Sequence, residues 1–79
     1  MTAERERQLE AIFREVFSLP ADADVRRVRQ LNHEAWDSLG HVTLMAALES
    51  EFGVALDTNE MLTLTSFEAV RLFLESKAP

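Results

Sequence analysis

The chain is 79 residues long and contains no cysteine. Disulfide bonds and thiolate metal sites are therefore excluded, and no thiol of the protein itself can take part in chemistry. A chain of this length forms one domain, residues 1–79, with a single small core and no room for a deep catalytic cleft. We therefore expect a protein without catalytic activity and without a metal site.

Long apolar segments are also missing. The longest uninterrupted apolar run is Leu44 to Leu48, whereas a membrane-spanning helix needs roughly 20 apolar residues. Residues 1–7 are rich in charge and lack the apolar stretch of a signal peptide. These two absences lead us to expect no membrane span and a cytoplasmic location.

Positive charge is scarce in the second half of the chain. Residues 1–33 hold six acids and six arginines, whereas residues 34–79 hold eight acids against Arg71 and Lys77, so the net charge of −6 belongs to this half. Such a surface disfavours nucleic acid and anionic membrane as partners and favours proteins with basic docking patches. The alternative is that the acids serve only solubility.

No segment alternates between apolar and polar residues with a period of two, so we expect no strands. The apolar residues recur at helical spacing instead. Apolar residues that would share one face of a helix predict a helix over about residues 3–17, which is capped by Thr2 and ends before Pro20. Further helices are predicted from Ser38 to about Phe52, over about 58–63, and from a capping box at Thr65-Ser66-Phe67-Glu68 onward. The predicted fold is an all-α four-helix bundle with three longer helices and one short helix.

A long loop, residues 18–36, joins the first two predicted helices. Val25, Val28 and Leu31 lie three residues apart in it, which predicts either a turn or two of helix or side chains that pin the loop to the core. The loop also carries three arginines close together, Arg26, Arg27 and Arg29. They either form a solvated face that pairs with acids elsewhere or contact a phosphorylated group or partner.

The segment Trp36-Asp37-Ser38-Leu39 begins the second long helix. Asp37 is a good N-cap, and Ser38 would place its hydroxyl off the positive end of the helix, where free backbone donors favour an anion. The apolar arc of this helix spans roughly 220°, which is wider than a small core requires. We expect Leu44, Leu48 and Phe52 to point inward, Val42 and Ala46 to border the exposed face, and Glu49 to lie near Ser38.

A nucleophilic serine is one interpretation of Ser38. The hydrolase motif Gly-x-Ser-x-Gly fails because Trp36 occupies the place of its first glycine. His41 lies three residues further along the helix, but no scaffold for an oxyanion hole is evident. A second interpretation is that Ser38 merely helps to begin a helix.

The motif Asp37-Ser38-Leu39 resembles the prosthetic-group attachment site of acyl carrier proteins, including the related peptidyl carrier domains. Two further segments are similar to that family: residues 47–54, like the acidic end of its second helix, and residues 64–70, like the entry to its last helix. The resemblance runs in order along essentially the whole chain. Gly40, His41 and Thr43 stand where carriers of general fatty acid synthesis usually have acids, so the chain looks more like a free-standing, specialised carrier.

This resemblance implies a phosphoprotein in which Ser38 receives 4′-phosphopantetheine from coenzyme A, flanked by Asp37 and Leu39. The cofactor thiol would then hold an acyl or aminoacyl group as a thioester. The implied partners are a phosphopantetheinyl transferase and enzymes of lipid or polyketide biosynthesis, namely a loading ligase, a ketosynthase or an acyltransferase. They would meet Val42, Ala46 and Glu49 on a monomeric carrier. The alternative function is an unmodified helical module that binds a partner helix.

Within this resemblance, two neighbours of the serine have alternative roles. Trp36 is interpreted as a core lid over the helix start rather than as a cargo contact. His41 is interpreted as a packing or surface residue rather than as an electrostatic partner of the phosphate. Gly40 is expected to leave the backbone open beside the attachment point, at a cost in helix stability of about 1 kcal/mol relative to alanine.

Overall fold

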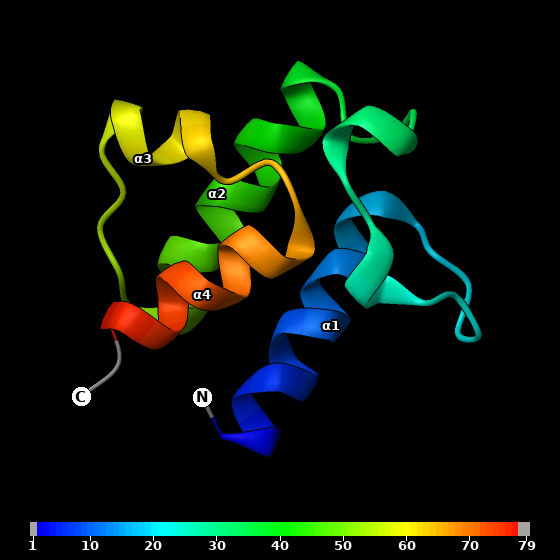
Figure 1. Cartoon of the computed structure of the whole chain (residues 1–79), viewed down its shortest axis with the longest axis horizontal. Helices are drawn as coiled ribbons and strands as arrows, with labels where there is room; N and C mark the ends of the chain where they lie inside the picture. The colour runs from blue at the N-terminus through cyan, green and yellow to red at the C-terminus, as the bar shows by residue number, and fades with distance from the viewer. Residues whose placement is uncertain (1, 78–79) are drawn as a thin grey trace.

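A computed structural model describes residues 2–77 (Figure 1). The helices are α1 (Ala3–Phe17), α2 (Ser38–Phe52), α3 (Thr58–Thr63) and α4 (Phe67–Lys77), and two single 3-10 turns, η1 (Val25–Arg27) and η2 (Gln30–Asn32), lie in the loop between α1 and α2. Within residues 2–77 there is no strand, and only an isolated antiparallel bridge joins Arg29 to Ser66. The predicted all-α bundle of three longer helices and one short helix is confirmed.

The helix ends follow local capping chemistry. The hydroxyl of Thr2 accepts a hydrogen bond from the Arg5 amide at 3.2 Å, and α2 ends at Gly53, whose φ of 64° is left-handed. Asp57 and Glu60 form the reciprocal capping box predicted for α3. The box predicted at Thr65 is wrong by one residue. Ser66 caps α4 by accepting from the Ala69 amide at 3.0 Å, and Ala69 has no side chain that can reach back to the cap.

The core lies between α1, α2 and α4 and is rich in aromatic rings. The Phe13 ring meets the rings of Phe67 and Trp36 edge-on, with centroids 5.0 and 5.5 Å apart, and Phe17 stacks on Trp36 at 4.9 Å. Aliphatic residues complete the core, among them Leu9, Leu44, Met45, Leu48, Val70 and Leu74. Leu44 and Leu48 point inward as predicted, whereas Phe52 is only half-buried.

The loop between α1 and α2 is anchored to α4 rather than free. Val25 and Val28 are buried, and two backbone hydrogen bonds join the loop to the entry of α4: the Gln30 amide donates to Thr65 at 2.9 Å, and the Phe67 amide donates to Val28 at 3.0 Å. The two 3-10 turns agree with the predicted turn or two of helix, but Leu31 does not pin the loop to the core, because its side chain is 98% exposed. The backbone is extended at Val28 and Arg29, so the three-residue spacing does not stay on one face.

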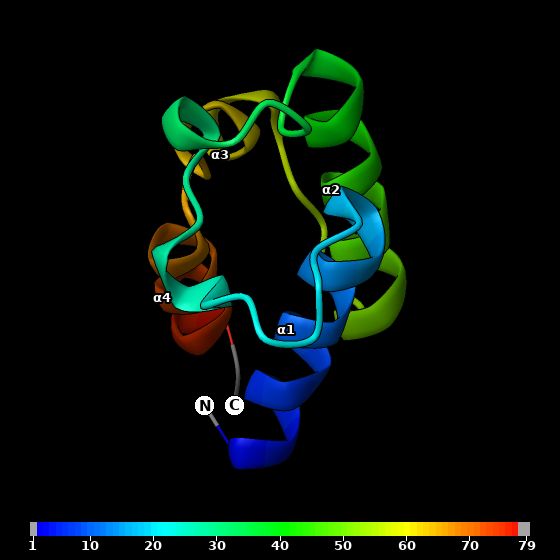
Figure 2. The same cartoon turned by 90° about the vertical axis from the view of Figure 1, so that its right-hand side faces the viewer.

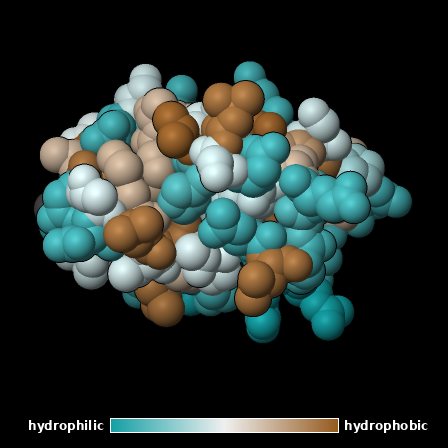
Figure 3. Space-filling view, turned by 90° about the horizontal axis from the view of Figure 1, so that it is seen from above, coloured by the Kyte–Doolittle hydropathy of each residue, from teal (hydrophilic) through white to brown (hydrophobic). Residues whose placement is uncertain are grey.

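Two different views show the same arrangement of the ends of the molecule. α1 and α2 run side by side in opposite directions, and the start of α2 lies at one end together with α3 and η2 (Figures 1 and 2). The first residues of α1 lie at the opposite end. Figure 3 looks onto the end that holds the start of α2 and shows hydrophobic side chains scattered among hydrophilic ones. The loop thus brings η2 to the same end as Ser38.

Candidate functional site at the start of α2

The first turn of α2 is ordered by Asp37. Its Oδ1 accepts a hydrogen bond from the Gly40 amide at 2.8 Å, and its carbonyl accepts from the His41 amide at 2.8 Å. Ser38 is exposed at the first position of the helix. The backbone amides of Ser38 and Leu39 donate no hydrogen bond to any other described residue. An exposed hydroxyl therefore lies beside unpaired donors at the positive end of a 15-residue helix.

Trp36 and His41 connect the loop to two helices. The indole of Trp36 is only 2% exposed, and its Nε1–H donates to Nδ1 of His41 at 2.9 Å. Nε2 of His41 lies 2.7 Å from the carbonyl oxygen of Met61 in α3. Because Nδ1 accepts, Nε2 carries the proton and donates, so the neutral imidazole satisfies both contacts. The packing role predicted for both residues agrees with this geometry.

Gly40 is closely approached by the loop, which corrects the expectation of an open backbone there. A Cβ at this position would fall well inside van der Waals contact of the Ala35 carbonyl oxygen and would lie 3.2 Å from Cε1 of Phe17. The loop therefore crosses the first turn of α2 at the one residue without a side chain. This crossing holds Trp36 and Asp37 in place just before Ser38.

The residues predicted to meet partners follow Ser38 along α2. Leu39 and Val42 are 75% and 65% exposed, and Ala46 is also exposed. Glu49 is half-buried, and its Oε2 accepts a hydrogen bond from the Leu56 amide at 3.0 Å, so it also anchors the link to α3. A shallow hollow of about 150 Å³ between α2 and α3 is lined by His41, Val42, Met45, Ala46, Glu49 and Met61.

α3 contributes residues that sequence reasoning missed. Met61 closes one side of the hollow, and the adjacent Leu62 is 69% exposed. The signal for this was the pair Met61-Leu62 in a helix of only six residues, where two adjacent apolar side chains cannot both face the core. The exposed apolar surface near Ser38 therefore includes α3 as well as α2.

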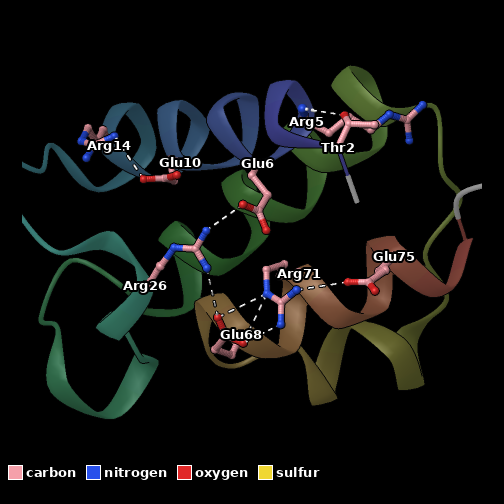
Figure 4. Close-up of polar contacts among 9 residues, drawn as sticks. All are labelled: Thr2, Arg5, Glu6, Glu10, Arg14, Arg26, Glu68, Arg71 and Glu75. Atoms are coloured by element: carbon pink, nitrogen blue, oxygen red, sulfur yellow. Dashed lines mark hydrogen bonds and ion pairs between the residues drawn. The ribbon is translucent and has the colours of Figure 1, made fainter.

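Ion pairs join the α1–α2 loop, α1 and α4 (Figure 4). Arg26 donates to Glu6 of α1 at 2.7 Å and lies 3.9 Å from Glu68 of α4, which in turn pairs with Arg71 at 2.9 Å. The hydrogen bond from Arg71, assisted by the positive charges of Arg71 and Arg26, lowers the pKa of Glu68 despite partial desolvation. The same bond raises the pKa of Arg71. Arg26 therefore pairs with acids, as one of the two interpretations of the basic cluster predicts.

Comparison of the chain with protein-family models, with curated proteins and with solved structures finds no match. Within residues 2–77 no helix has the length and apolar character needed to cross a membrane. The same part of the chain holds no cluster of three or more side chains suited to binding a metal ion. The interpretation of the site therefore depends on its geometry and on the sequence motif.

Proposed function

We propose that the protein is an acyl carrier protein in which Ser38 receives 4′-phosphopantetheine from coenzyme A. The observation that carries this proposal is the position of Ser38: it is the exposed first residue of α2, next to unpaired amide donors and behind the Asp37 cap. A phosphodiester on Oγ would be favoured by these donors and by the helix dipole. The fold has the three long helices and one short helix that the resemblance implies.

The absence of cysteine supports the same function. A thioester carrier needs a thiol, and this chain can obtain one only by importing it with a prosthetic group. The group would hold an acyl or aminoacyl cargo as a thioester and present it to partner enzymes. Those partners are a phosphopantetheinyl transferase and a loading ligase, ketosynthase or acyltransferase of a specialised lipid or polyketide pathway. The carrier acts as a cytoplasmic monomer.

The contacts of His41 favour a carrier over a serine hydrolase. Both of its ring nitrogens are engaged, one with Trp36 and the other with Met61, so neither is free to take a proton from Ser38. These contacts support a carrier role without catalysis by a Ser38–His41 pair. Leu39, Val42 and Ala46 lie on α2 after the serine and form the surface that partner enzymes contact, together with Leu62 of α3.

A second candidate function is an unmodified interaction module. The observation that favours it is the exposure of Leu39, Val42 and Leu62, which together offer an apolar surface to a partner helix without any use of Ser38. In that case Ser38 only begins the helix. Modification at Ser38 distinguishes the two functions.

The test is incubation of the chain with coenzyme A and a broad-specificity phosphopantetheinyl transferase, followed by intact-mass measurement. We expect the mass of one phosphopantetheinyl group to be added to the wild-type chain. Ser38→Ala should gain nothing, and Ser50→Ala, a matched control at an exposed serine of the same helix, should gain the group normally. An unchanged wild-type mass, or an equal gain in Ser38→Ala, would overturn the carrier function.

A further inference from the structure

A second hollow lies away from the proposed attachment site, between the α1–α2 loop and the start of α4. It has a volume of about 650 Å³, within the range of about 300–1,000 Å³ that is typical of binding clefts. Three arginines, Leu31 and Asn32 form the loop side, Val28 contributes from the buried core, and Thr65, Ser66 and Glu68 form the α4 side. None of these residues takes part in the function proposed above.

The three arginines of this hollow differ in their charge balance. The charge of Arg26 is balanced by Glu6 and Glu68. Glu68 is in turn balanced by Arg26 and Arg71. Arg27 and Arg29 are exposed and form no ion pair with any residue in the part of the chain that the structure describes. Two unneutralised guanidinium groups thus lie together on a protein whose net charge is −6. Their natural complement is an anion, and carboxylates match the geometry of a guanidinium group well.

The loop that carries these two arginines is already ordered. The side chain of Asn32 joins both positions, since its Oδ1 accepts from the Arg29 amide at 2.9 Å and its Nδ2 donates to the Arg27 carbonyl at 3.2 Å. The hydrogen bonds from Gln30 to Thr65 and from Phe67 to Val28 attach the loop to α4. A partner that binds here would lose little affinity to the ordering of the loop.

Leu31 narrows the chemistry of the occupant. Its side chain is 98% exposed at the edge of the hollow, whereas Val25 and Val28 of the same loop are buried in the core. A fully exposed leucine beside two free arginines is complementary to a segment that combines acidic and apolar side chains. Nucleic acid fits less well, because its phosphates are repelled by the acidic remainder of the protein, whose net charge is −6.

We infer that the hollow formed by Arg27, Arg29, Leu31 and the start of α4 is a docking site for an acidic, leucine-containing segment of a partner protein. Carboxylates of the segment pair with Arg27 and Arg29, and an apolar side chain covers Leu31. The site is separate from Ser38 and does not depend on its modification. Because η2 and the start of α2 lie at the same end of the molecule, a partner docked here remains near Ser38 (Figures 1 and 2).

The test is an NMR titration of the isotopically labelled full chain with an acetylated, amidated peptide built of Glu-Glu-Leu repeats. We expect saturable binding below about 1 mM, with shifts confined to the amides of residues 26–32 and 65–68. The double variant Arg27→Gln/Arg29→Gln should bind about three- to tenfold more weakly, and added salt should weaken binding of the wild type. Leu31→Ser should weaken binding of the same peptide by a similar factor.

The matched control is Arg5→Gln/Arg7→Gln, which removes the same charge from α1. It should bind the peptide as the wild type does, and thermal unfolding should show that all three variants remain folded. Absence of binding, shifts centred on α2 and α3, or equal weakening by the α1 control would overturn the docking site. So would a concentration-dependent dimer that Arg27→Gln/Arg29→Gln dissociates, because the acidic face of a second copy would then be the occupant.

Discussion

Gly40 lies at the point where the loop before α2 crosses the first turn of that helix. The carbonyl oxygen of Ala35 approaches so closely that a Cβ could not be added without a backbone shift. The motif predicted that this residue keeps the backbone open for a cofactor, and the structure gives it a different role in loop packing. A single residue thus determines how Asp37 and Ser38 are presented.

Gly40→Ala tests this role, because the loop contact and helix propensity predict changes in stability of opposite sign. Helix propensity alone predicts that alanine stabilises the protein by up to about 1 kcal/mol. The close contact with Ala35 predicts a loss instead, of about 1–3 kcal/mol, because the loop must move. Urea unfolding followed by circular dichroism measures the difference, with Thr43→Ala, at an exposed site of the same helix, as a control that should change stability little. A more stable Gly40→Ala would contradict the packing.

Substitution of His41 tests the hydrogen bonds that join the loop, α2 and α3. His41→Leu leaves the buried Nε1–H of Trp36 and the Met61 carbonyl without their partner, so we expect a loss of stability of about 1–3 kcal/mol. Trp36→Phe removes the indole donor. If the Trp36–His41 hydrogen bond causes the loss, His41→Leu should lower the free energy of unfolding less in a chain that already carries Trp36→Phe. Urea unfolding of the single and double variants should then give a coupling energy of at least about 0.5 kcal/mol. Strictly additive effects would contradict it.

At the scale of elements, local signals predicted the helices well. The bounds of α1, α2 and α3 follow from residues that carry their own information: Thr2 and Asp57 as caps, Gly53 as a left-handed end. The errors came where tertiary contacts decide. Thr65 and Ser66 are both good caps, and the pairing of Gln30 with Thr65 leaves Ser66 as the one that caps α4.

In the candidate site, too, local features were predictable from the sequence and features that depend on tertiary contacts were not. Asp37, Ser38 and Leu39 could be placed from the motif and from cap chemistry, which act over a few residues. The exposure of Leu31 could not be predicted, because it depends on how η2 is placed against the rest of the chain, and the pair Met61-Leu62 indicated that α3 exposes an apolar residue but not where. The fold class was therefore predictable, whereas the surface around the site was predicted only in part.

The pairing of α4 with α1 and the loop predicts a pH dependence. The pKa of Glu68 is lowered in the folded state. Its ion pairs therefore contribute fully to the stability of the fold at a pH above the unfolded pKa of about 4.3, and this contribution is lost as the pH falls through the folded pKa. Glu68 is half exposed, so the effect is small. We expect Glu68→Gln to be less stable than the wild type by about 0.2–1 kcal/mol at pH 7.

The difference in stability between Glu68→Gln and the wild type should shrink as the pH falls below the unfolded value of about 4.3 and through the lowered folded pKa of Glu68. Thermal unfolding over a pH series at constant low salt measures it. Glu51→Gln is a control at an exposed glutamate of α2 and should follow the wild type at every pH. A stability difference that stays constant down to acid pH would contradict the ion pairs of Glu68.

At the scale of the whole molecule, apolar surface and charge are unevenly distributed. The start of α2, α3 and η2 share one end (Figures 1 and 2), and these elements carry the exposed Leu39, Leu62 and Leu31. The ion pairs of Arg26, Glu68 and Arg71 join the loop and α4 to α1 (Figure 4), and Arg26 and Glu68 also line the hollow beside Leu31. The exposed leucines and the ion pairs that stabilise the fold are therefore different side chains, and the two sets meet at the hollow that Leu31 shares with Arg26 and Glu68.

Val42→Asp tests the partner surface on α2. Val42 is 65% exposed, so the substitution should change stability by less than about 0.5 kcal/mol. If the transferase contacts this face, kcat/KM for modification should fall about three- to tenfold. Leu72→Asp, at an exposed leucine of α4, is the matched control and should be modified at the wild-type rate. Equal rates for both variants would place the contact elsewhere.

The most direct test of the carrier function uses the absence of cysteine. After incubation with coenzyme A and a phosphopantetheinyl transferase and removal of free coenzyme A, any thiol that remains on the chain has been imported. Titration of thiols under denaturing conditions should rise from zero to one per chain for the wild type and stay at zero for Ser38→Ala. A wild-type chain that gains no thiol, or a Ser38→Ala chain that gains one, would contradict the attachment of a carrier arm at Ser38.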